Sequence, residues 1–290
     1  MMDWLEEPLF RPPAEADSLI FQVSRGCPHN TCCFCGMYKT VPYRTRSLLE
    51  IFREIDRAAE FSGTSVRRIF LADGDAMFLP FGTLCRILEY LNEKFPRLAR
   101  VTMYANGSSA LAKTEEALAR LRKLKLAIVY MGLESGSEEV LRLVRKDDTA
   151  AHMTEAVRRL RNAGIRTSVM VLGGIGGRRH GTVHVRDTIA ALNAMQPEIL
   201  SLLRFIEVPG LRMYNSYEPL TEYESVAEMR DLIAGLELKS TVFRANHASV
   251  PFPLEGRLPK DRERMSALLD RVLEEGNLDR KGPGHVPLFL

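Results

Sequence analysis

The stretch SLIFQVSRGCPHNTCCFC, residues 18–35, begins with an apolar, β-rich run and ends in four closely spaced cysteines. The run Ser18 to Val23 predicts a short buried strand, and the cysteines then form the loop that follows it. Thiolates at short spacing on one loop can surround a soft metal centre, because the backbone curls and the sulfurs point inward. The stretch therefore predicts a strand that delivers a metal-binding loop.

Two sets of three thiols are possible ligands. Cys27, Cys32 and Cys35 give a C-x4-C-x2-C pattern, whereas Cys27, Cys33 and Cys35 leave one residue between the last pair. We prefer the first set, because a gap of two residues lets both thiolates reach one cluster without strain, and Cys33 is then a spare thiol. A structural zinc site is the alternative. It needs a fourth ligand, for which His29 is the only nearby candidate.

The composition is that of an ordinary globular protein. The chain has 290 residues, of which 46% are hydrophobic and 27% charged, and its net charge of +3 indicates neither a nucleic-acid partner nor a membrane surface. No stretch approaches the roughly 18 apolar residues that span a bilayer, and the acidic, proline-broken start is not a secretion signal. Crowded thiols without a disulfide framework predict a reducing cytoplasm.

Short apolar runs alternate with longer amphipathic stretches, which predicts an α/β fold built from parallel βα units. The expected strands are Ser18 to Val23, Arg68 to Ala72, Arg100 to Ala105, Ala127 to Leu133, Thr167 to Leu172 and Ile199 to Ile206. The expected helices are Ser47 to Phe61, Gly82 to Lys94, Thr114 to Lys123, Ser137 to Leu143, Ala151 to Ala163 and Thr182 to Met195.

After Pro209 the alternation stops and a mostly helical pattern follows. It predicts helices over Thr221 to Leu236 and Lys260 to Glu275, separated by a loop. We therefore expect an N-terminal extension (1–17), a barrel-like domain (18–210) and a C-terminal helical extension (211–290).

Chemically unusual residues follow the end of each expected strand. These are the cysteines, Asp73 to Asp75, Asn106, the segment GLESG (132–136), the segment GGIGG (173–177), and Arg204 with Glu207. The carboxyl ends of parallel strands meet on one face of a barrel or in the crevice of an open sheet, and active sites are built there. The clustering alone does not choose between these two architectures.

The cysteine segment resembles the cluster-binding loop of the radical S-adenosylmethionine (SAM) superfamily. That family has three cysteines after the first strand of a partial barrel and an aromatic residue before the last cysteine, here Phe34. The first gap has four residues, where the commonest family pattern has three. The resemblance implies a partial (β/α)6 TIM-like barrel, a [4Fe-4S] cluster on Cys27, Cys32 and Cys35, and SAM bound to the iron that lacks a protein ligand.

The resemblance extends to roughly residue 209 and implies further SAM contacts. Asp73-Gly74-Asp75 matches the motif that contacts the methionyl amino group, Glu134 matches the ribose-binding position, and GGIGG matches the segment beside adenine. Each has a plainer interpretation, which is an ordinary polar turn, a helix-capping glutamate and a flexible loop. The full set expected around SAM is Phe34, Asp73, Gly74, Asp75, Asn106, Glu134, Gly173, Gly174 and Arg204.

The catalytic candidates are Arg204, His247 and Tyr38. Arg204 could pair with the carboxylate of SAM or of a substrate, a role for which Lys146 and Arg145 compete. His247 lies in the extension and could reach the rim, although a lone histidine is more often structural. Tyr38 could equally be a packing aromatic.

The resemblance implies an enzyme that reductively cleaves SAM to a 5′-deoxyadenosyl radical and takes hydrogen from a small organic substrate. A reductant such as flavodoxin or ferredoxin is the implied partner, and the overall look is closest to relatives of oxygen-independent coproporphyrinogen oxidase and elongator-like members. The alternative is an iron-sulfur electron carrier or sensor that never cleaves SAM.

Overall fold

A computed structural model describes residues 5–62 and 65–286. Residues 1–4 of the expected N-terminal extension and 287–290 of the C-terminal extension lie outside this part. The chain divides into two compact units. The first comprises Met1–Asn30, Cys35–Met131 and Glu155–Thr167, and the second comprises Thr31–Phe34, Gly132–Thr154 and Ser168–Leu290. This division cuts across the expected domain 18–210, whose boundaries stay a prediction.

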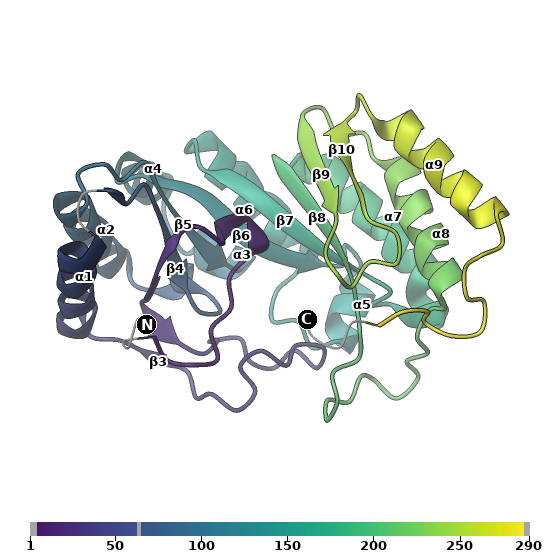
Figure 1. The fold of residues 1–290 in the computed structure, drawn as a ribbon, viewed down its shortest axis with the longest axis horizontal. Coiled ribbons are helices and arrows are strands. Elements are labelled where there is room, and N and C mark those ends of the chain that lie inside the picture. Colours follow the sequence, from purple (N-terminus) through teal and green to yellow (C-terminus); the bar gives the residue numbers. More distant parts are fainter. Residues whose placement is uncertain (1–4, 63–64, 287–290) are drawn as a thin grey trace. The chain divides into compact units, whose positions relative to one another are not determined.

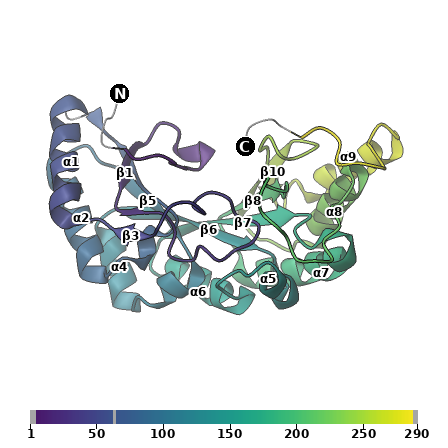
Figure 2. The ribbon, with the colours of Figure 1, turned by 90° about the horizontal axis from the view of Figure 1, so that it is seen from below.

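The first unit is built on parallel strands in the order β1 (Leu19–Gln22), β4 (Arg68–Ala72), β5 (Arg100–Ala105) and residues 126–131 of β6 (Leu126–Glu134). Helices α1 (Leu48–Ser62), α2 (Phe81–Lys94) and α4 (Glu115–Lys123) lie along one face of these strands (Figure 2). The opposite face carries a cluster of Ile20, Phe70, Ala72, Ile128 and Tyr130. Parallel strands separated by helices are the expected product of the alternating sequence pattern.

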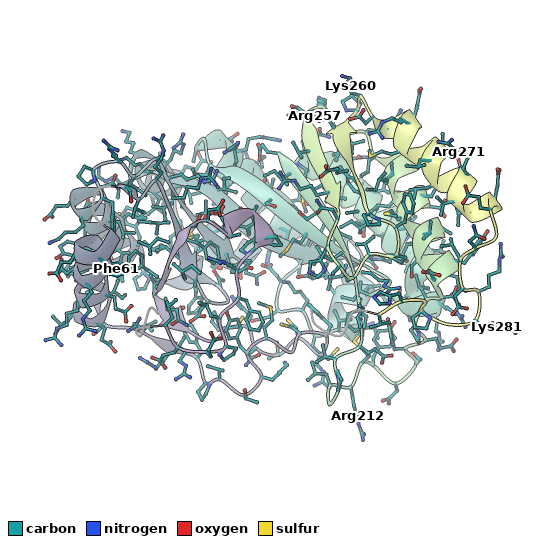
Figure 3. All side chains as sticks on the ribbon, in the orientation of Figure 1. Phe61, Arg212, Arg257, Lys260, Arg271 and Lys281 are labelled. Atoms are coloured by element: carbon teal, nitrogen blue, oxygen red, sulfur yellow. The ribbon has the colours of Figure 1, made fainter. Side chains whose placement is uncertain are left out.

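Helix faces in the first unit follow the sequence period. In α2 the fully buried residues are Leu84, Ile87, Leu88 and Leu91, which recur at helical spacing and point to the sheet. By contrast, Phe61 near the end of α1 is 85% exposed and points away from the strands (Figure 3). The unit also contains η1 (Pro13–Glu15), the antiparallel pair β2 (Ser24–Arg25) and β3 (Arg44–Thr45), η3 (Ala76–Phe78), α3 (Gly107–Leu111) and most of α6 (Ala150–Asn162).

The second unit continues with β7 (Arg166–Gly173), β8 (Ile199–Arg204), β9 (Thr241–Ala245) and β10 (Leu254–Leu258). The pairs β7–β8 and β8–β9 are parallel, and β9–β10 is antiparallel. The helices of this unit are α5 (Glu138–Leu143), α7 (Gly177–Met195), α8 (Glu222–Gly235) and α9 (Arg262–Glu274), with α9 beside α8 (Figure 1). None of the helices among the described residues is long and apolar enough to cross a membrane.

The expected α/β class is confirmed, and all six expected strands are present. The extension holds both expected helices, as α8 and α9, but it also contains two strands that the sequence analysis takes for loop. β9 adds a further parallel strand beside β8, with α8 as its crossover helix. The alternation of helices and strands therefore resumes after the long connection between β8 and α8. β10 then forms the edge of the sheet as a short strand with charged residues.

Candidate functional site

The cysteine loop is shared between the two units. Cys27 and Cys35 belong to the first unit, and Cys32 and Cys33 belong to the second. Over residues 5–62 and 65–286, no three histidine, cysteine, aspartate or glutamate side chains are gathered as a metal site.

In the first unit, Cys27 packs directly on the backbone after β4. The amide of Gly74 donates to the carbonyl of Gly26 at 3.0 Å. A Cβ placed on Gly74 would lie 2.5 Å from Cys27 Cβ and 2.8 Å from its sulfur. Only glycine allows this approach. The expected SAM motif and an expected cluster ligand are thus brought together, and the donor set of three thiols suits an iron-sulfur cluster.

In the second unit, the middle of the loop docks on the end of α5. The amide of Cys33 donates to the carbonyl of Val144 at 3.0 Å, and the thiol of Cys33 lies 3.9 Å from the sulfur of Met213. Phe34 packs against a cluster centred on Val140, Val144 and Ile175. Cys33 is thus engaged in packing, which favours Cys32 as the ligand.

Asp75 holds the loop and the first strand ends together. It accepts hydrogen bonds from the amide of Phe78 at 3.1 Å and from the hydroxyl of Ser109, and its Oδ2 lies 2.9 Å from Nε2 of His29. The hydroxyl of Ser109 also lies 3.3 Å from the carbonyl of Asn106. Because Asp75 contacts Nε2 of His29, this histidine could act as the fourth zinc ligand only through Nδ1.

Asp73 is a buried carboxylate with a left-handed backbone, at φ +78°. The hydroxyl of Tyr38 donates to Oδ1 of Asp73 at 3.0 Å, and the side-chain amide nitrogen of Gln22 lies 3.5 Å from both carboxylate oxygens. Burial raises the pKa of Asp73 to about 6, against the hydrogen bonds, which lower it. Burial and Asp73 in turn raise the pKa of Tyr38. Tyr38 therefore supports Asp73, and both Asp73 and Asp75 use their carboxylates on neighbours within the first unit.

Glu134 ends β6 in the second unit with φ +62° and is 8% exposed. Its Oε1 lies 3.5 Å from Nζ of Lys146 and curls back over Gly132, where a Cβ would clash with it. Burial raises the pKa of Glu134, and Lys146 opposes this shift. A strained, buried carboxylate with one cationic neighbour retains acceptor capacity for a ligand hydroxyl.

The ends of β7 and β8 bring together Gly173, Arg204 and His247. Gly173 is the register partner of Arg204. The amide of Arg204 donates to Oγ of Ser249 at 3.1 Å, and Nδ1 of His247 lies 2.9 Å from the same oxygen. The Arg204 guanidinium donates to the carbonyls of Pro283 and His285, at 2.6 and 2.8 Å.

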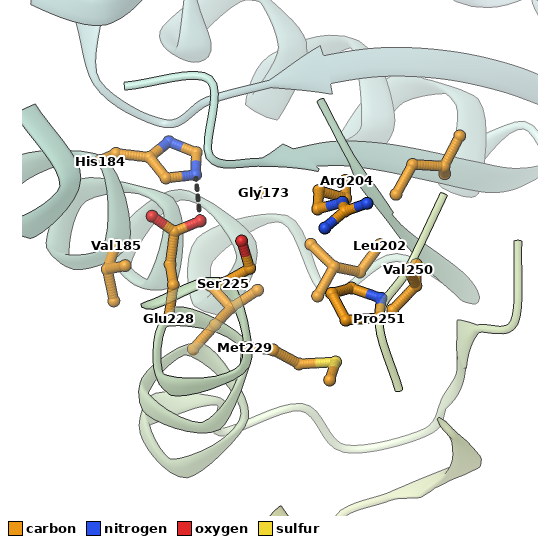
Figure 4. Close-up of a pocket in the computed structure, with 12 residues that line it drawn as sticks. Gly173, His184, Val185, Leu202, Arg204, Ser225, Glu228, Met229, Val250 and Pro251 are labelled. Atoms are coloured by element: carbon orange, nitrogen blue, oxygen red, sulfur yellow. Dashed lines mark ion pairs between the residues drawn. The ribbon is translucent and has the colours of Figure 1, made fainter. Parts of the chain in front are cut away.

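Two residues that the sequence analysis did not select support the glycine segment. The carboxylate of Glu228, on α8, accepts the amide hydrogen of Gly174 at 2.6 Å, and His184, on α7, lies beside it (Figure 4). Both are polar residues on the buried faces of their helices. The sequence did contain a signal for Glu228, because this charged residue falls on the apolar face of α8 with Met229 and Leu232. Charged residues are seldom buried without a partner.

Sequence comparison identifies the family. The radical SAM superfamily profile matches residues 21–187, more than half of the chain. The chain belongs to the radical SAM superfamily. The predicted family and class of enzyme are confirmed by this match, and SAM with a [4Fe-4S] cluster are the cofactors of that class. An anaerobic magnesium-protoporphyrin IX monomethyl ester cyclase from Cereibacter sphaeroides is 27% identical over 204 residues, covering 69% of this radical SAM chain and 32% of that protein.

Solved structures share the fold. Methylornithine synthase superposes with a TM-score of 0.52 at 14% identity, covering 92% of this chain and 83% of that protein. Coproporphyrinogen III oxidase from Escherichia coli superposes with a TM-score of 0.51 at 15% identity, covering 89% of this chain and 52% of that protein. A radical SAM methyltransferase from Kitasatospora setae was solved with cobalamin and a [4Fe-4S] cluster. It superposes with a TM-score of 0.52 at 20% identity, covering 82% of this chain and 44% of that protein. These likenesses show that the chain shares its fold with these proteins.

Proposed function

We propose that this radical SAM protein reductively cleaves SAM and uses the resulting radical to take hydrogen from a small organic substrate. The observation that carries the proposal is the order of the cysteine loop, DGD, GLESG and GGIGG at successive strand ends within the family match. When bound, the cluster would supply the electron for reductive cleavage of SAM to methionine and a 5′-deoxyadenosyl radical, which would become 5′-deoxyadenosine on taking a substrate hydrogen atom.

Each group of residues has a proposed role that its chemistry suits. Cys27, Cys32 and Cys35 would hold the cluster through thiolates. Carbonyls of the Asp73-Gly74-Asp75 segment suit the methionyl amino group better than its carboxylates, which are bonded to neighbours. The other residues that we propose to contact SAM are Phe34, Asn106, Glu134, Gly173, Gly174 and Arg204.

The protein orients these groups and limits access of water. Glu134 would accept the ribose hydroxyls, and Lys146 would keep its carboxylate ionised in a buried place. Arg204 would bind a carboxylate of SAM or substrate after exchanging its hydrogen bonds to Pro283 and His285. His247 would act on the substrate near Arg204, because the hydroxyl oxygen of Ser249 contacts both residues.

The substrate is proposed only as a small organic molecule. The chain spans about a third of the length of the curated cyclase it matches, so the tetrapyrrole named there is not carried over. A small electron donor such as flavodoxin or ferredoxin in a reducing cytoplasm would supply the electron, and neither nucleic acid nor membrane is required.

The test is anaerobic reconstitution with iron and sulfide, followed by dithionite and SAM, with 5′-deoxyadenosine measured by chromatography. Formation of 5′-deoxyadenosine supports the proposal. A cluster that binds no SAM points to an electron carrier or sensor, and a colourless protein with stoichiometric zinc points to a structural metal site. Either outcome overturns the proposal.

The ligand set is tested with matched thiol variants. Replacing Cys27, Cys32 or Cys35 with alanine should abolish iron incorporation, because three thiolates are needed to hold the cluster. Cys33→Ala is the control and should keep the cluster, since its thiol packs against Met213. Loss of iron in Cys33→Ala with retention in Cys32→Ala would reverse the assignment.

A further inference from the structure

A chain of buried polar groups runs through the second unit from β6 to β7. The amide of Ser137 donates to Oγ of Ser135 at 3.1 Å, and that oxygen lies 2.8 Å from Nδ1 of His184. On the other side of the ring, Nε2 lies 3.8 Å from Oε1 of Glu228, whose carboxylate accepts the amide hydrogen of Gly174. Figure 4 shows the imidazole of His184 facing the Glu228 carboxylate, and both side chains line the pocket.

The hydrogen-bond directions in this chain are consistent. The Oγ of Ser135 accepts from the Ser137 amide and can donate its own proton to Nδ1 of His184; we assign this direction, which places the ring proton on Nε2. That proton faces the Glu228 carboxylate. The separation of 3.8 Å exceeds a hydrogen bond, and the adjoining cavity of about 20 Å³ has room for one bridging water.

The two ends of this chain coincide with two expected nucleoside contacts. Ser135 directly follows Glu134, expected at ribose, and Gly174 belongs to the glycine segment expected beside adenine. Gly174 has φ +79°, which glycine adopts without strain, and Glu228 of the extension fixes the direction of its amide by accepting the amide hydrogen. Both His184, at 1% exposure, and Glu228, at 9%, are nearly inaccessible to water.

We propose that His184 and Glu228 are positioning residues that fix the ends of β6 and β7 in the geometry that binds the nucleoside of SAM. The carboxylate from α8 orients the Gly174 amide, and the imidazole links it to the Ser135 turn. The C-terminal extension thereby becomes part of the SAM site without contacting SAM. The SAM-binding side of this inference rests on the proposed function.

The charge state of the pair supports this arrangement. Burial lowers the pKa of His184 to about 4, although the negative charge of Asp187 raises it, so the ring is neutral at pH 7. Burial raises the pKa of Glu228 to about 7, although the Gly174 amide lowers it. The charged or titratable groups around Glu228 are His184 and Asp187 on α7, Arg204 on β8, Tyr217 in the connection after β8, and Asp231 on α8.

The first experiment measures amide hydrogen exchange of residues 173–177 in the protein without SAM. In Glu228→Ala the Gly174 amide loses its acceptor, so its exchange should accelerate about tenfold or more, relative to a β9 peptide that reports global opening. Glu228→Gln keeps an acceptor oxygen and should restore most of the protection. Glu237→Ala removes an exposed carboxylate just beyond α8 and is the matched control.

The second experiment measures the dissociation constant of SAM with the same variants after anaerobic reconstitution. Glu228→Ala and His184→Ala should bind SAM about tenfold more weakly, with Glu228→Gln between them and the wild type. Unchanged exchange at 173–177 in Glu228→Ala, or unchanged SAM affinity despite faster exchange, overturns the inference. If the wild type itself binds no SAM, the proposed function fails, while the exchange data still decide whether Glu228 holds the segment.

Discussion

Gly74 is the residue at which the backbone leaves no space for a side chain beside Cys27. A methyl group there would lie 2.5 Å from Cys27 Cβ, so Gly74→Ala must displace the cysteine or the strand end. We expect Gly74→Ala to lose most of its iron after reconstitution, measured as iron per protein and visible absorption. Gly82→Ala is the control, because nothing lies within 4 Å of the added Cβ. Equal iron in both variants would contradict this account of Gly74.

Tyr38 stabilises the ionised form of buried Asp73. Asp73 has a pKa of about 6 in the folded chain, above its ordinary value of 3.8. Its contribution to stability is therefore complete below about pH 4 and is lost as the pH rises through 6. Removing the hydroxyl raises that pKa further, so Tyr38→Phe should lose about 1.5–3 kcal/mol at pH 8 and less at pH 5. Urea unfolding at both pH values measures this, and an equal loss at both would refute it.

Single residues show where prediction from sequence succeeds and where it stops. The positions of Asp73, Glu134 and Gly174 at strand ends were predictable, because short apolar runs and their terminating residues are local features. Their partners were not. Tyr38 lies 35 positions from Asp73, and Glu228 lies 54 positions from Gly174, so these bonds depend on the tertiary fold.

On helix α8, the buried carboxylate of Glu228 that bonds Gly174 lowers the stability of the folded chain when it ionises. Glu228 has a pKa of about 7, above its ordinary value of 4.5, so the stability it contributes is full below 4.5 and is lost as the pH rises through 7. Glutamine cannot ionise and avoids that penalty. Glu228→Gln should therefore melt roughly 2–4 °C above the wild type at pH 8 for each kcal/mol regained.

The check on Glu228→Gln is thermal unfolding from pH 5 to pH 9. The difference in melting temperature should shrink toward pH 5, where the wild-type carboxyl is also neutral. Glu237→Gln changes an exposed carboxylate and should follow the wild type throughout. A difference for Glu228→Gln that is constant with pH would show that ionisation of Glu228 is not its cause.

Elements also differ in how well the sequence defines them. β4 and β5 have the predicted bounds, since each is a continuous apolar run between turn signals. β10 was missed because prolines 251 and 253 break the stretch before Leu254–Leu258, and β9, Thr241–Ala245, was missed although it is as long as β4. Pairing with β8 and with each other forms these strands, and that pairing has no local pattern.

At the scale of the whole molecule, the C-terminal residues belong to the compact second unit together with β7 and β8. β9 covers the edge of β8 at the pairs Ile199↔Val242, Leu200↔Phe243 and Ser201↔Arg244. The buried residues of α8 include Val226, Met229, Leu232 and Ile233. At about 2 kcal/mol for each buried side chain, exposing these four would cost about 8 kcal/mol of burial free energy before chain entropy is counted.

A chain ending at residue 210 should therefore fail to fold, although the sequence pattern marks a boundary there. Its β8 edge would be open to pairing with other chains, and we expect aggregation and no cooperative thermal transition. A chain ending at Lys281 is the control. It keeps every described helix and strand and loses the Pro283 and His285 carbonyls that bind Arg204, so it should melt only a few degrees lower. Cooperative unfolding of residues 1–210 near the melting temperature of the full chain would instead establish 18–210 as an independent domain and remove the extension from the folding unit.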